Sequence, residues 1–415
     1  MREMLENKTL QLGIDFKVAC EQIIPAGSTT LAKSYKRLYQ GYSPFYATHA
    51  EGCYFWDLDG NKWLDCEMSM GSAVWGYCRK EIDDAIIKQL HKGIMFSIPG
   101  TLEYELAIKL LSRYPQYEAV KYFKNGADAV YAAIRSSRRL TRKIKTLSCE
   151  YHGWLDWSCF NYYRLEPQLM GIPESTATEN MSCECDSNMI IQTIHRYKHE
   201  LACVILCPAN HKKNNLSEIA KLCKSENIML IFDEVTSGMR FARGGATQLF
   251  GIIPDYLCIS KGVANGLPLA VTLGKREHIM IMEQLKISNA HSGEHLSLAA
   301  AIASEELLSS ASEWPSWRSG IESLCEEIEN TFKTLGADCT LKIIGNVGCL
   351  SIIDTSPEKS ENFRRFFITS LSRYNIFTKG FIIFCDAHSI ENMKYVQNAV
   401  CECVKNYYSP NNTNS

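Results

Sequence analysis

The chain has 415 residues and a formal net charge of −2, and 46% of its residues are hydrophobic and 22% charged. This is the composition of an ordinary globular protein, and the near-neutral charge gives no reason to expect a nucleic acid or an anionic membrane as a partner. The sequence contains no window of about 18 apolar residues that could span a membrane, and its first residues carry charges where a signal peptide would need an apolar run.

Cysteine is frequent in this sequence, with 18 residues scattered through apolar stretches. In a chain of this size, that distribution predicts reduced and mostly buried thiols in a cytoplasmic protein rather than a disulfide framework. Cys183 and Cys185 resemble half of a metal site, but no second Cys/His pair lies nearby at zinc spacing. We therefore predict no metal.

The predicted elements begin with a hairpin. Tyr54–Leu58 and Lys62–Asp65 have strand patterns and flank Asp59-Gly60, a pair typical of a tight hairpin turn. Beyond it, helices are predicted over Glu81–His91, Glu103–Tyr114, Ala127–Leu140 and Ser217–Glu226, and strands over Val120–Phe123, Ile144–Cys149, Ala202–Cys207, Met229–Phe232, Tyr256–Ile259 and Ala270–Gly274. Strands that alternate with helices form βαβ units, so this part of the chain predicts an α/β domain with a mainly parallel sheet.

After about Glu294 long helices dominate. Helical patterns cover Leu296–Leu308, Trp317–Leu335, Glu361–Tyr374 and Ser389–Tyr407, and strand patterns cover Leu341–Ile344, Cys349–Ile353 and Ile382–Cys385. We expect helices on a small antiparallel sheet here, and divide the chain into an N-terminal segment with the hairpin (1–66), a large domain (67–308) and a C-terminal α+β domain (309–415). The stretch Phe160–Asp186 has little periodicity, and a connection of that length is usually a lid or a binding loop.

Two residues at predicted strand ends carry reactive groups. Asp233 ends a buried strand, where open α/β sheets bind ligands, although a lone Asp there is also a plain helix N-cap. Lys261 follows the strand Tyr256–Ile259 and is either a surface lysine or a partly desolvated nucleophile. Together they supply what pyridoxal 5′-phosphate (PLP) chemistry requires, which is a lysine for a Schiff base and an acid for the pyridine nitrogen.

The motifs around these two residues resemble the signature of the class III aminotransferases, PLP enzymes of fold type I. The matching elements are Asp233-Glu234-Val235, Gly238-x-Arg240, Gly244-Gly245, Phe250-Gly251, Pro254-Asp255, Ser260-Lys261-Gly262 and Asn265-Gly266-Leu267-Pro268. Upstream, Gly52–Gly60 and Trp63–Asp65 are similar to the family's hairpin. The resemblance covers nearly the whole chain and implies a large domain with a mainly parallel sheet, a smaller C-terminal α+β domain, and a homodimer with a shared active site.

The resemblance also implies which residues hold PLP. Gly126 and Ala127 match the family's phosphate loop, where amides at a helix N-terminus bind an anion; the family usually has Thr at the position of Ala127. Tyr151 and Gly153 match the aromatic-Gly step that stacks on the cofactor ring, with Val235 on the opposite ring face.

Two positions near the expected cofactor site stay open at this point. His152 is either a structural histidine or a catalytic one. The family's phosphate-binding Thr from the neighbouring subunit corresponds to Ala290 here, and Ser288 or Ser292 would replace it, with Ser292 taken as the candidate.

The expected substrate contacts come from the same resemblance. Ile24–Lys33 is similar to the entry loop of the glutamate-1-semialdehyde aminomutases. Those enzymes have a carboxylate-binding Arg in this loop, and this chain has Lys33 at that position. Lys lacks the bidentate fork of Arg, so this exchange is not conservative. Ser28 in this loop is a further substrate candidate, and so is Glu234, with a supporting hydrogen-bonding role.

The function implied is a ping-pong aminotransferase in which Lys261 moves a proton and the amino group passes from an amino acid to a small or sugar-like aldehyde or ketone. The alternative is glutamate-1-semialdehyde 2,1-aminomutase. A decarboxylase or racemase of the same fold would keep Lys261 and Asp233 as well. A protein without catalytic activity would need neither Lys261 nor Asp233. A nicotinamide dehydrogenase would need a Gly-x-Gly-x-x-Gly turn after an early strand, which the sequence lacks.

Overall fold

The computed structural model describes residues 9–160, 166–240, 242–311, 317–336, 339–346 and 349–408. The chain divides into two compact units, Met1–Arg79 together with Pro315–Ser415, and Lys80–Trp314. The N-terminal segment and the C-terminal domain, which the sequence suggested as separate parts, thus belong to one unit. Among the helices of the described ranges, none is long and apolar enough to cross a membrane.

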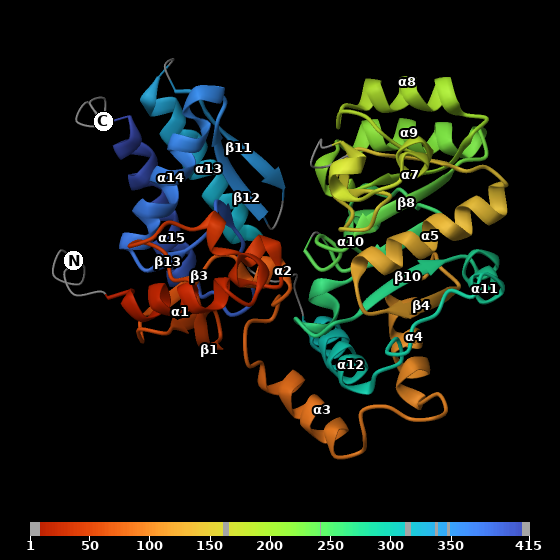
Figure 1. The fold of residues 1–415 in the computed structure, drawn as a ribbon, viewed down its shortest axis with the longest axis horizontal. Coiled ribbons are helices and arrows are strands. Elements are labelled where there is room, and N and C mark those ends of the chain that lie inside the picture. Colours follow the sequence, from red (N-terminus) through yellow and green to blue (C-terminus); the bar gives the residue numbers. More distant parts are fainter. Residues whose placement is uncertain are drawn as a thin grey trace. The chain divides into compact units, whose positions relative to one another are not determined.

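The second unit is built on a seven-stranded sheet (Figure 1). Its strand order is β4 (Ala119–Phe123), β10 (Ala270–Gly274), β9 (Tyr256–Ile259), β8 (Met229–Glu234), β7 (Leu201–Leu206), β5 (Lys145–Ser148) and β6 (Asn180–Ser182). The five strands from β9 to β6 are parallel, and β10 is antiparallel to β9 and β4. The mainly parallel sheet predicted from the sequence is therefore confirmed.

Helices surround this sheet. They are α3 (Lys80–Leu90), α4 (Thr101–Arg113), α5 (Gly126–Thr141), α7 (Glu174–Glu179), α8 (Ser187–Tyr197), α9 (Lys213–Ser225), α10 (Gly245–Phe250), α11 (Arg276–Gln284) and α12 (His295–Ser310). The face of α5 that packs on the sheet consists of small buried residues at helical spacing, Ala129, Ala133 and Ser136. Small side chains let the helix approach the sheet closely, and Ser136 Oγ lies 2.6 Å from Tyr256 Oη on β9.

The stretch Phe160–Asp186, predicted as a lid or loop, contains regular structure. Its described residues include the short helices η5 (Pro167–Met170) and α7 and the edge strand β6. The strand pairs in parallel with β5, and the Asn180 side chain accepts hydrogen bonds from Thr146 Oγ1 and Arg138. These elements are three to six residues long, too short to leave a periodic pattern; residues 161–165 lie outside the described ranges.

The first unit contains two small sheets. One has the order β1 (Ala47–Glu51), β2 (Tyr54–Asp57), β3 (Lys62–Asp65) and β13 (Ile376–Phe377), and the other the order β11 (Leu341–Asn346), β12 (Cys349–Asp354) and β14 (Phe381–Ile382). Its helices are α1 (Gln11–Glu21), α2 (Met68–Gly71), α13 (Trp317–Leu335), α14 (Pro357–Arg373) and α15 (Ile390–Tyr407), with the short helices η2 (Pro25–Gly27), η3 (Leu31–Lys33) and η4 (Tyr35–Arg37).

The predicted hairpin and the small antiparallel sheet of this unit are confirmed. The parallel pair of β13 with β3, in which Ile376 faces Leu64, joins the N-terminal segment to the C-terminal part. The strand predicted over Ile382–Cys385 is limited to Phe381–Ile382.

Candidate active site

Asp233 and Lys261 lie at the carboxyl ends of neighbouring parallel strands. The register of β8 and β9 pairs Asp233 with Cys258, and Lys261 follows β9 by two residues. Lys261 has a φ of 49°, a left-handed conformation that is strained for a residue with a side chain, and it opens the short helix η7 (Lys261–Ala264). Its Nζ donates a hydrogen bond of 2.7 Å to Thr236 Oγ1 in the turn after β8, so the amine is held on the side of the strand end that carries Asp233.

The carboxylate of Asp233 is buried and oriented by two hydrogen bonds. Oδ2 lies 2.7 Å from Nδ1 of His152, and Oδ1 accepts from the Val235 amide at 3.0 Å. Each carboxylate oxygen has a second lone pair, so the group can still accept from a further N–H. Residues 235–240 form turns, so Asp233 does not cap a helix.

His152 is the side-chain partner of Asp233 in the described structure. Its side chain is buried, and its Nε2 faces Glu150 Oε2 at 3.6 Å. Burial alone lowers the pKa of this imidazole, but the nearby groups of Cys207, Asp233 and Glu150 raise it well above its ordinary value. A protonated His152 donates a hydrogen bond through Nδ1 to Asp233 Oδ2.

Two glycines let three loops pack directly on one another. A Cβ on Gly126, the first residue of α5, would lie 2.5 Å from Cγ2 of Val235. Gly153 has a φ of +111°, and a Cβ there would lie 2.6 Å from Cβ of Ala127. The loops that follow β4, β5 and β8 therefore meet at the N-terminus of α5, where every predicted cofactor-binding residue of these loops is found.

The start of α5 has the features of an anion site. The N-cap residue Asn125 makes no side-chain cap hydrogen bond, and its carbonyl accepts from the amides of Asp128 and Ala129. The amides of Gly126 and Ala127 precede these and belong to the first-turn donors that a helix does not satisfy internally. Tyr151, in the loop after β5, is 44% exposed, which leaves its ring accessible for stacking.

Glu234 does not lie where a substrate contact would require it. Its side chain is fully buried, and its carboxylate accepts from the amide of Ala246 at 3.0 and 2.8 Å and from Thr247 at 3.4 Å. These hydrogen bonds give acceptors to amide groups in the first turn of α10. Because the buried carboxylate also accepts from Ser237 Oγ at 3.3 Å, its hydrogen bonds go to protein groups, as a supporting role of Glu234 requires.

The remaining candidates, Ser292, Ser28 and Lys33, belong to segments outside these three loops. Ser292 precedes α12 and donates to Asn289 Oδ1 at 2.8 Å. Ser28 and Lys33 belong to the first unit, where Ser28 Oγ donates to the Thr30 carbonyl and Lys33 Nζ donates to Ser69 Oγ at 3.2 Å. Lys33 lines a cavity of about 330 Å³ in that unit, together with Lys379 and the carboxylates of Asp65 and Glu67.

The sequence reasoning missed Thr236 and Glu150. Thr236 lies in the matched motif, but nothing in its spacing shows that it would face Lys261. Glu150 precedes the recognised Tyr151-His152-Gly153 step, and its contacts with His152 and with His211 depend on the fold.

With this geometry established, residues 37–383 match the family model described as aminotransferase class-III. The chain belongs to this family. It is 32% identical over 321 residues to the glutamate-1-semialdehyde 2,1-aminomutase of Methanosarcina acetivorans, and the aligned region covers 72% of this chain and 74% of that protein. It is also 27% identical over 414 residues to the 3-aminobutyryl-CoA aminotransferase of Cloacimonas acidaminovorans, covering 96% of this chain and 98% of that protein.

The fold agrees with that of solved transaminases. An omega-transaminase from Sphaerobacter thermophilus superposes with a TM-score of 0.85 at 19% identity, and the superposed region covers 96% of this chain and 98% of the transaminase chain. The predicted family and the fold-type-I architecture are thus confirmed. The protein is a class III aminotransferase-family enzyme, whose cofactor is PLP, and the strand-end acid, the lysine and the open helix N-terminus fit that group.

Proposed function

We propose that this enzyme transfers an amino group from an amino-acid donor to a small or sugar-like aldehyde or ketone in a ping-pong cycle. The observation that carries the proposal is the placement of Lys261 and Asp233 at adjacent strand ends beside the glycine-packed start of α5. When bound there, PLP supplies an electron sink that weakens the Cα–H bond of an amine substrate.

The protein groups have separate tasks in this proposal. Asp233, oriented by His152, holds a proton on the pyridine nitrogen. The amides of Gly126 and Ala127 bind the phosphate, with Ser292 as the candidate contact from the neighbouring subunit. Tyr151 and Val235 enclose the ring from its two faces, with Gly153 allowing the close approach of the loop.

Lys261 is the catalytic residue. Its Nζ would hold the cofactor covalently, and the amine would be placed to take a proton from the substrate Cα and to return it during the transfer. The hydrogen bond to Thr236 Oγ1 holds the amine near the end of β8, where this exchange would occur.

Lys33 and Ser28 are proposed to bind the acceptor substrate. The cavity that Lys33 lines contains two lysines and two carboxylic acids. Burial raises the pKa of Glu67 to about 7. A mixed lining of donors and acceptors suits a hydroxyl-bearing carbonyl compound better than a simple dicarboxylate, and a point-charged lysine grips a carboxylate less specifically than arginine does.

The second candidate is glutamate-1-semialdehyde 2,1-aminomutase, which the names of several relatives favour. A half-reaction assay separates the two functions. The PLP form is mixed with glutamate, alanine and other amines, and absorbance and product analysis follow its conversion to the pyridoxamine form. A transaminase needs a donor and releases the matching oxoacid, whereas conversion of glutamate 1-semialdehyde without any donor would replace our proposal by the aminomutase.

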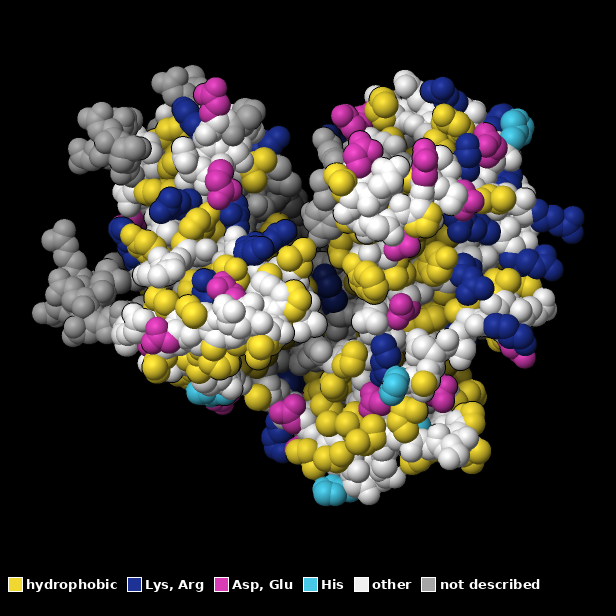
Figure 2. All heavy atoms as spheres, viewed as in Figure 1, with side chains coloured by type: hydrophobic (Ala, Val, Ile, Leu, Met, Phe, Trp, Pro, Cys, Tyr) yellow, Lys and Arg dark blue, Asp and Glu magenta, His cyan; other side chains and the backbone are white. Residues whose placement is uncertain are grey.

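We also propose a cytoplasmic homodimer. The cysteines of the described residues are free thiols, as in a reducing compartment. Exposed apolar side chains gather on α3, the segment after it and α4, and Figure 2 shows such side chains around α3 at the bottom of the view. They include Ile87, Leu90, Ile94, Met95, Phe96, Ile98, Tyr104 and Ile108. A patch of this kind marks a protein interface, and light scattering should give twice the chain mass of 47.0 kDa.

A further inference from the structure

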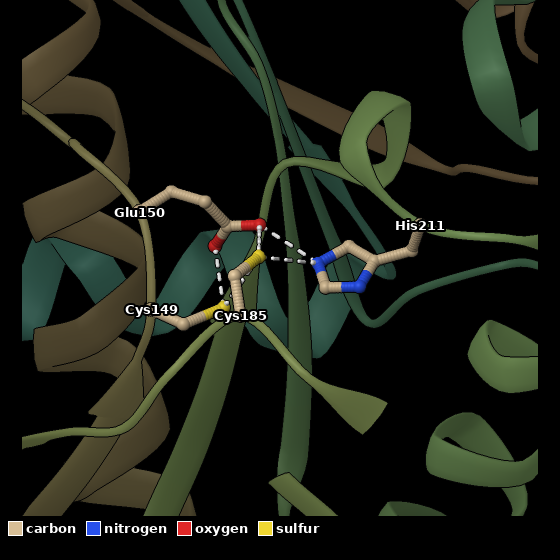
Figure 3. Close-up of side chains that lie close together, drawn as sticks. All are labelled: Cys149, Glu150, Cys185 and His211. Carbon is tan, nitrogen blue, oxygen red and sulfur yellow. Dashed lines mark hydrogen bonds and ion pairs between the residues drawn. The ribbon is translucent and has the colours of Figure 1, made fainter. Parts of the chain in front are cut away.

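Four side chains with metal-binding atoms meet beside the cofactor site. Cys149 and Glu150 directly follow β5, Cys185 follows β6, and His211 follows β7 and the short helix η6 (Pro208–Asn210). These three parallel strands are neighbours in the sheet, so their carboxyl ends lie at one edge. Figure 3 shows the four side chains pointing toward one another from three separate loops.

The donor atoms of the four side chains lie in mutual contact. Sγ of Cys185 lies 3.3 Å from Sγ of Cys149, 3.3 Å from Glu150 Oε1 and 3.7 Å from His211 Nε2. Glu150 Oε1 lies 2.7 Å from His211 Nε2, and Glu150 Oε2 lies 3.1 Å from Sγ of Cys149. All four donor atoms lie within 4.8 Å of one another.

These distances suit a tetrahedral ion. With Zn–S bonds of about 2.3 Å and Zn–N and Zn–O bonds of about 2.0–2.2 Å, the edges of a tetrahedral donor set are roughly 3.3–3.8 Å. The 2.7 Å contact between Glu150 Oε1 and His211 Nε2 would have to open by roughly 0.6 Å, and the contacts of 3.1–3.3 Å by less. Two sulfurs, one imidazole nitrogen and one carboxylate oxygen form a set that selects zinc over the hard cations magnesium and calcium.

We propose that Cys149, Glu150, Cys185 and His211 bind one zinc ion. The carboxylate and the imidazole are fixed parts of the site, since the side chains of Glu150 and His211 are 8% and 2% exposed. Cys185 is exposed and offers an entry path for the ion. Four protein ligands make a closed site of the structural type, which would tie together the loops after β5, β6 and β7.

The protonation states of the ligands make binding depend on pH. The hydrogen bond from the Cys149 thiol and the neighbouring His211 lower the pKa of Cys185 to about 6, against the effect of burial. Burial would raise the pKa of Glu150, but the imidazoles of His152 and His211 hold it well below its ordinary value. Zinc would displace the protons of Cys149 and His211, so binding should release protons and weaken as the pH falls.

The site would also act on the cofactor-binding acid. Glu150 Oε1 contacts His211, while Glu150 Oε2 contacts Cys149 and also faces His152 Nε2 at 3.6 Å. His152 in turn contacts Asp233. An ion that fixes Glu150 thereby fixes the orientation of His152 and Asp233. This proposal replaces the prediction of no metal made from the sequence. That prediction considered the pair Cys183 and Cys185, whereas the four proposed ligands come from three loops and include only Cys185 of that pair.

Metal analysis of the full-length protein tests the proposal. The protein is reduced, incubated with zinc, dialysed against buffer and analysed by mass spectrometry for metal content, with a thiol reagent as a second readout. We expect one zinc per chain and protection of two thiols. The cobalt-substituted protein should show the charge-transfer and visible bands of tetrahedral thiolate coordination.

Variants assign the ion to the cluster. Cys185→Ser and His211→Gln should each weaken zinc binding at least tenfold, while Cys183→Ser, two residues from Cys185 and outside the cluster, should bind like wild type. Circular dichroism without metal shows that each variant is folded. The proposal is overturned if reduced wild type retains no zinc, if the two ligand variants retain as much as Cys183→Ser, or if Cys149 and Cys185 form a disulfide instead.

Discussion

At the scale of single residues, Gly126 sets how closely the loop after β8 approaches α5. Gly126→Ala would place a methyl group 2.5 Å from Cγ2 of Val235, so one of the two must move. We expect PLP affinity, measured by fluorescence titration, to fall about tenfold or more, which corresponds to about 1.4 kcal/mol.

A matched control and a rescue belong to this experiment. Gly13→Ala in α1 meets its nearest atoms only at ordinary contact distance, 3.8 Å or more, and should leave PLP affinity unchanged. Adding Val235→Ala to Gly126→Ala should recover part of the lost affinity. Unchanged affinity in Gly126→Ala would mean that this contact does not shape the cofactor site.

Glu234 makes the folded state sensitive to pH. Burial raises the pKa of this carboxyl from 4.5 to about 7, even though the amides of Ala246 and Thr247 counteract the shift. The folded state therefore holds a proton that the unfolded state releases, and this group's contribution to stability falls as the pH rises from about 4.5 to 7.

The variant Glu234→Gln isolates this effect. The difference between the unfolding free energies of wild type and variant, measured by urea denaturation across this pH range, should change by up to roughly 3 kcal/mol. Wild type should lose stability relative to the variant with rising pH. Parallel pH profiles for the two proteins would show that Glu234 does not titrate in this way.

The predicted cofactor residues Gly126, Ala127, Gly153 and Val235 meet at the start of α5, and Asp233 and Lys261 lie at adjacent strand ends. Motif order reveals them because Asp233, Val235 and Lys261 lie within one continuous segment. Contacts between distant loops are different. Nothing in the sequence shows that His152 would orient Asp233, because the two side chains meet only after β5 and β8 have taken their places in the sheet.

At the scale of elements, α4 and α12 are joined by two ion pairs that differ mainly in burial. Arg113 and Glu305 are 6% and 3% exposed at 2.6 Å, whereas Lys109 and Glu306 are 36% and 61% exposed at 3.0 Å. Glu305→Gln leaves a buried guanidinium without its counter-charge and should cost about 3 kcal/mol or more, while Glu306→Gln should cost less than about 1 kcal/mol. Equal losses in denaturant titrations would contradict this account.

Elements with a clear apolar run or helical period could be predicted from the sequence, and strands of two or three residues could not. The strands β9 and β10 and the helix α13 have the boundaries that their patterns indicate, because their apolar residues repeat over whole buried faces. The strand β6 has three residues and β13 has two. Segments this short show no period, and their structure depends on pairing with β5 and β3.

At the scale of the whole molecule, the division into two units is not visible in the order of the chain. The N-terminal hairpin and the C-terminal α+β segment form one unit through the β3–β13 pair, although more than 300 positions separate the paired residues Leu64 and Ile376. A sequence pattern identifies each segment but not its pairing partner. The family match supplies the reaction class. Our proposal assigns part of the substrate choice to Lys33.

The central claim is that Lys261 carries the cofactor. The PLP-loaded enzyme is reduced with borohydride and digested, and the modified peptide is identified by mass spectrometry. We predict one pyridoxyl phosphate group per chain on Lys261, and loss of both this label and the visible absorbance in the folded Lys261→Ala variant. Labelling of another lysine, or a wild-type protein that stays colourless with added PLP, would contradict the account.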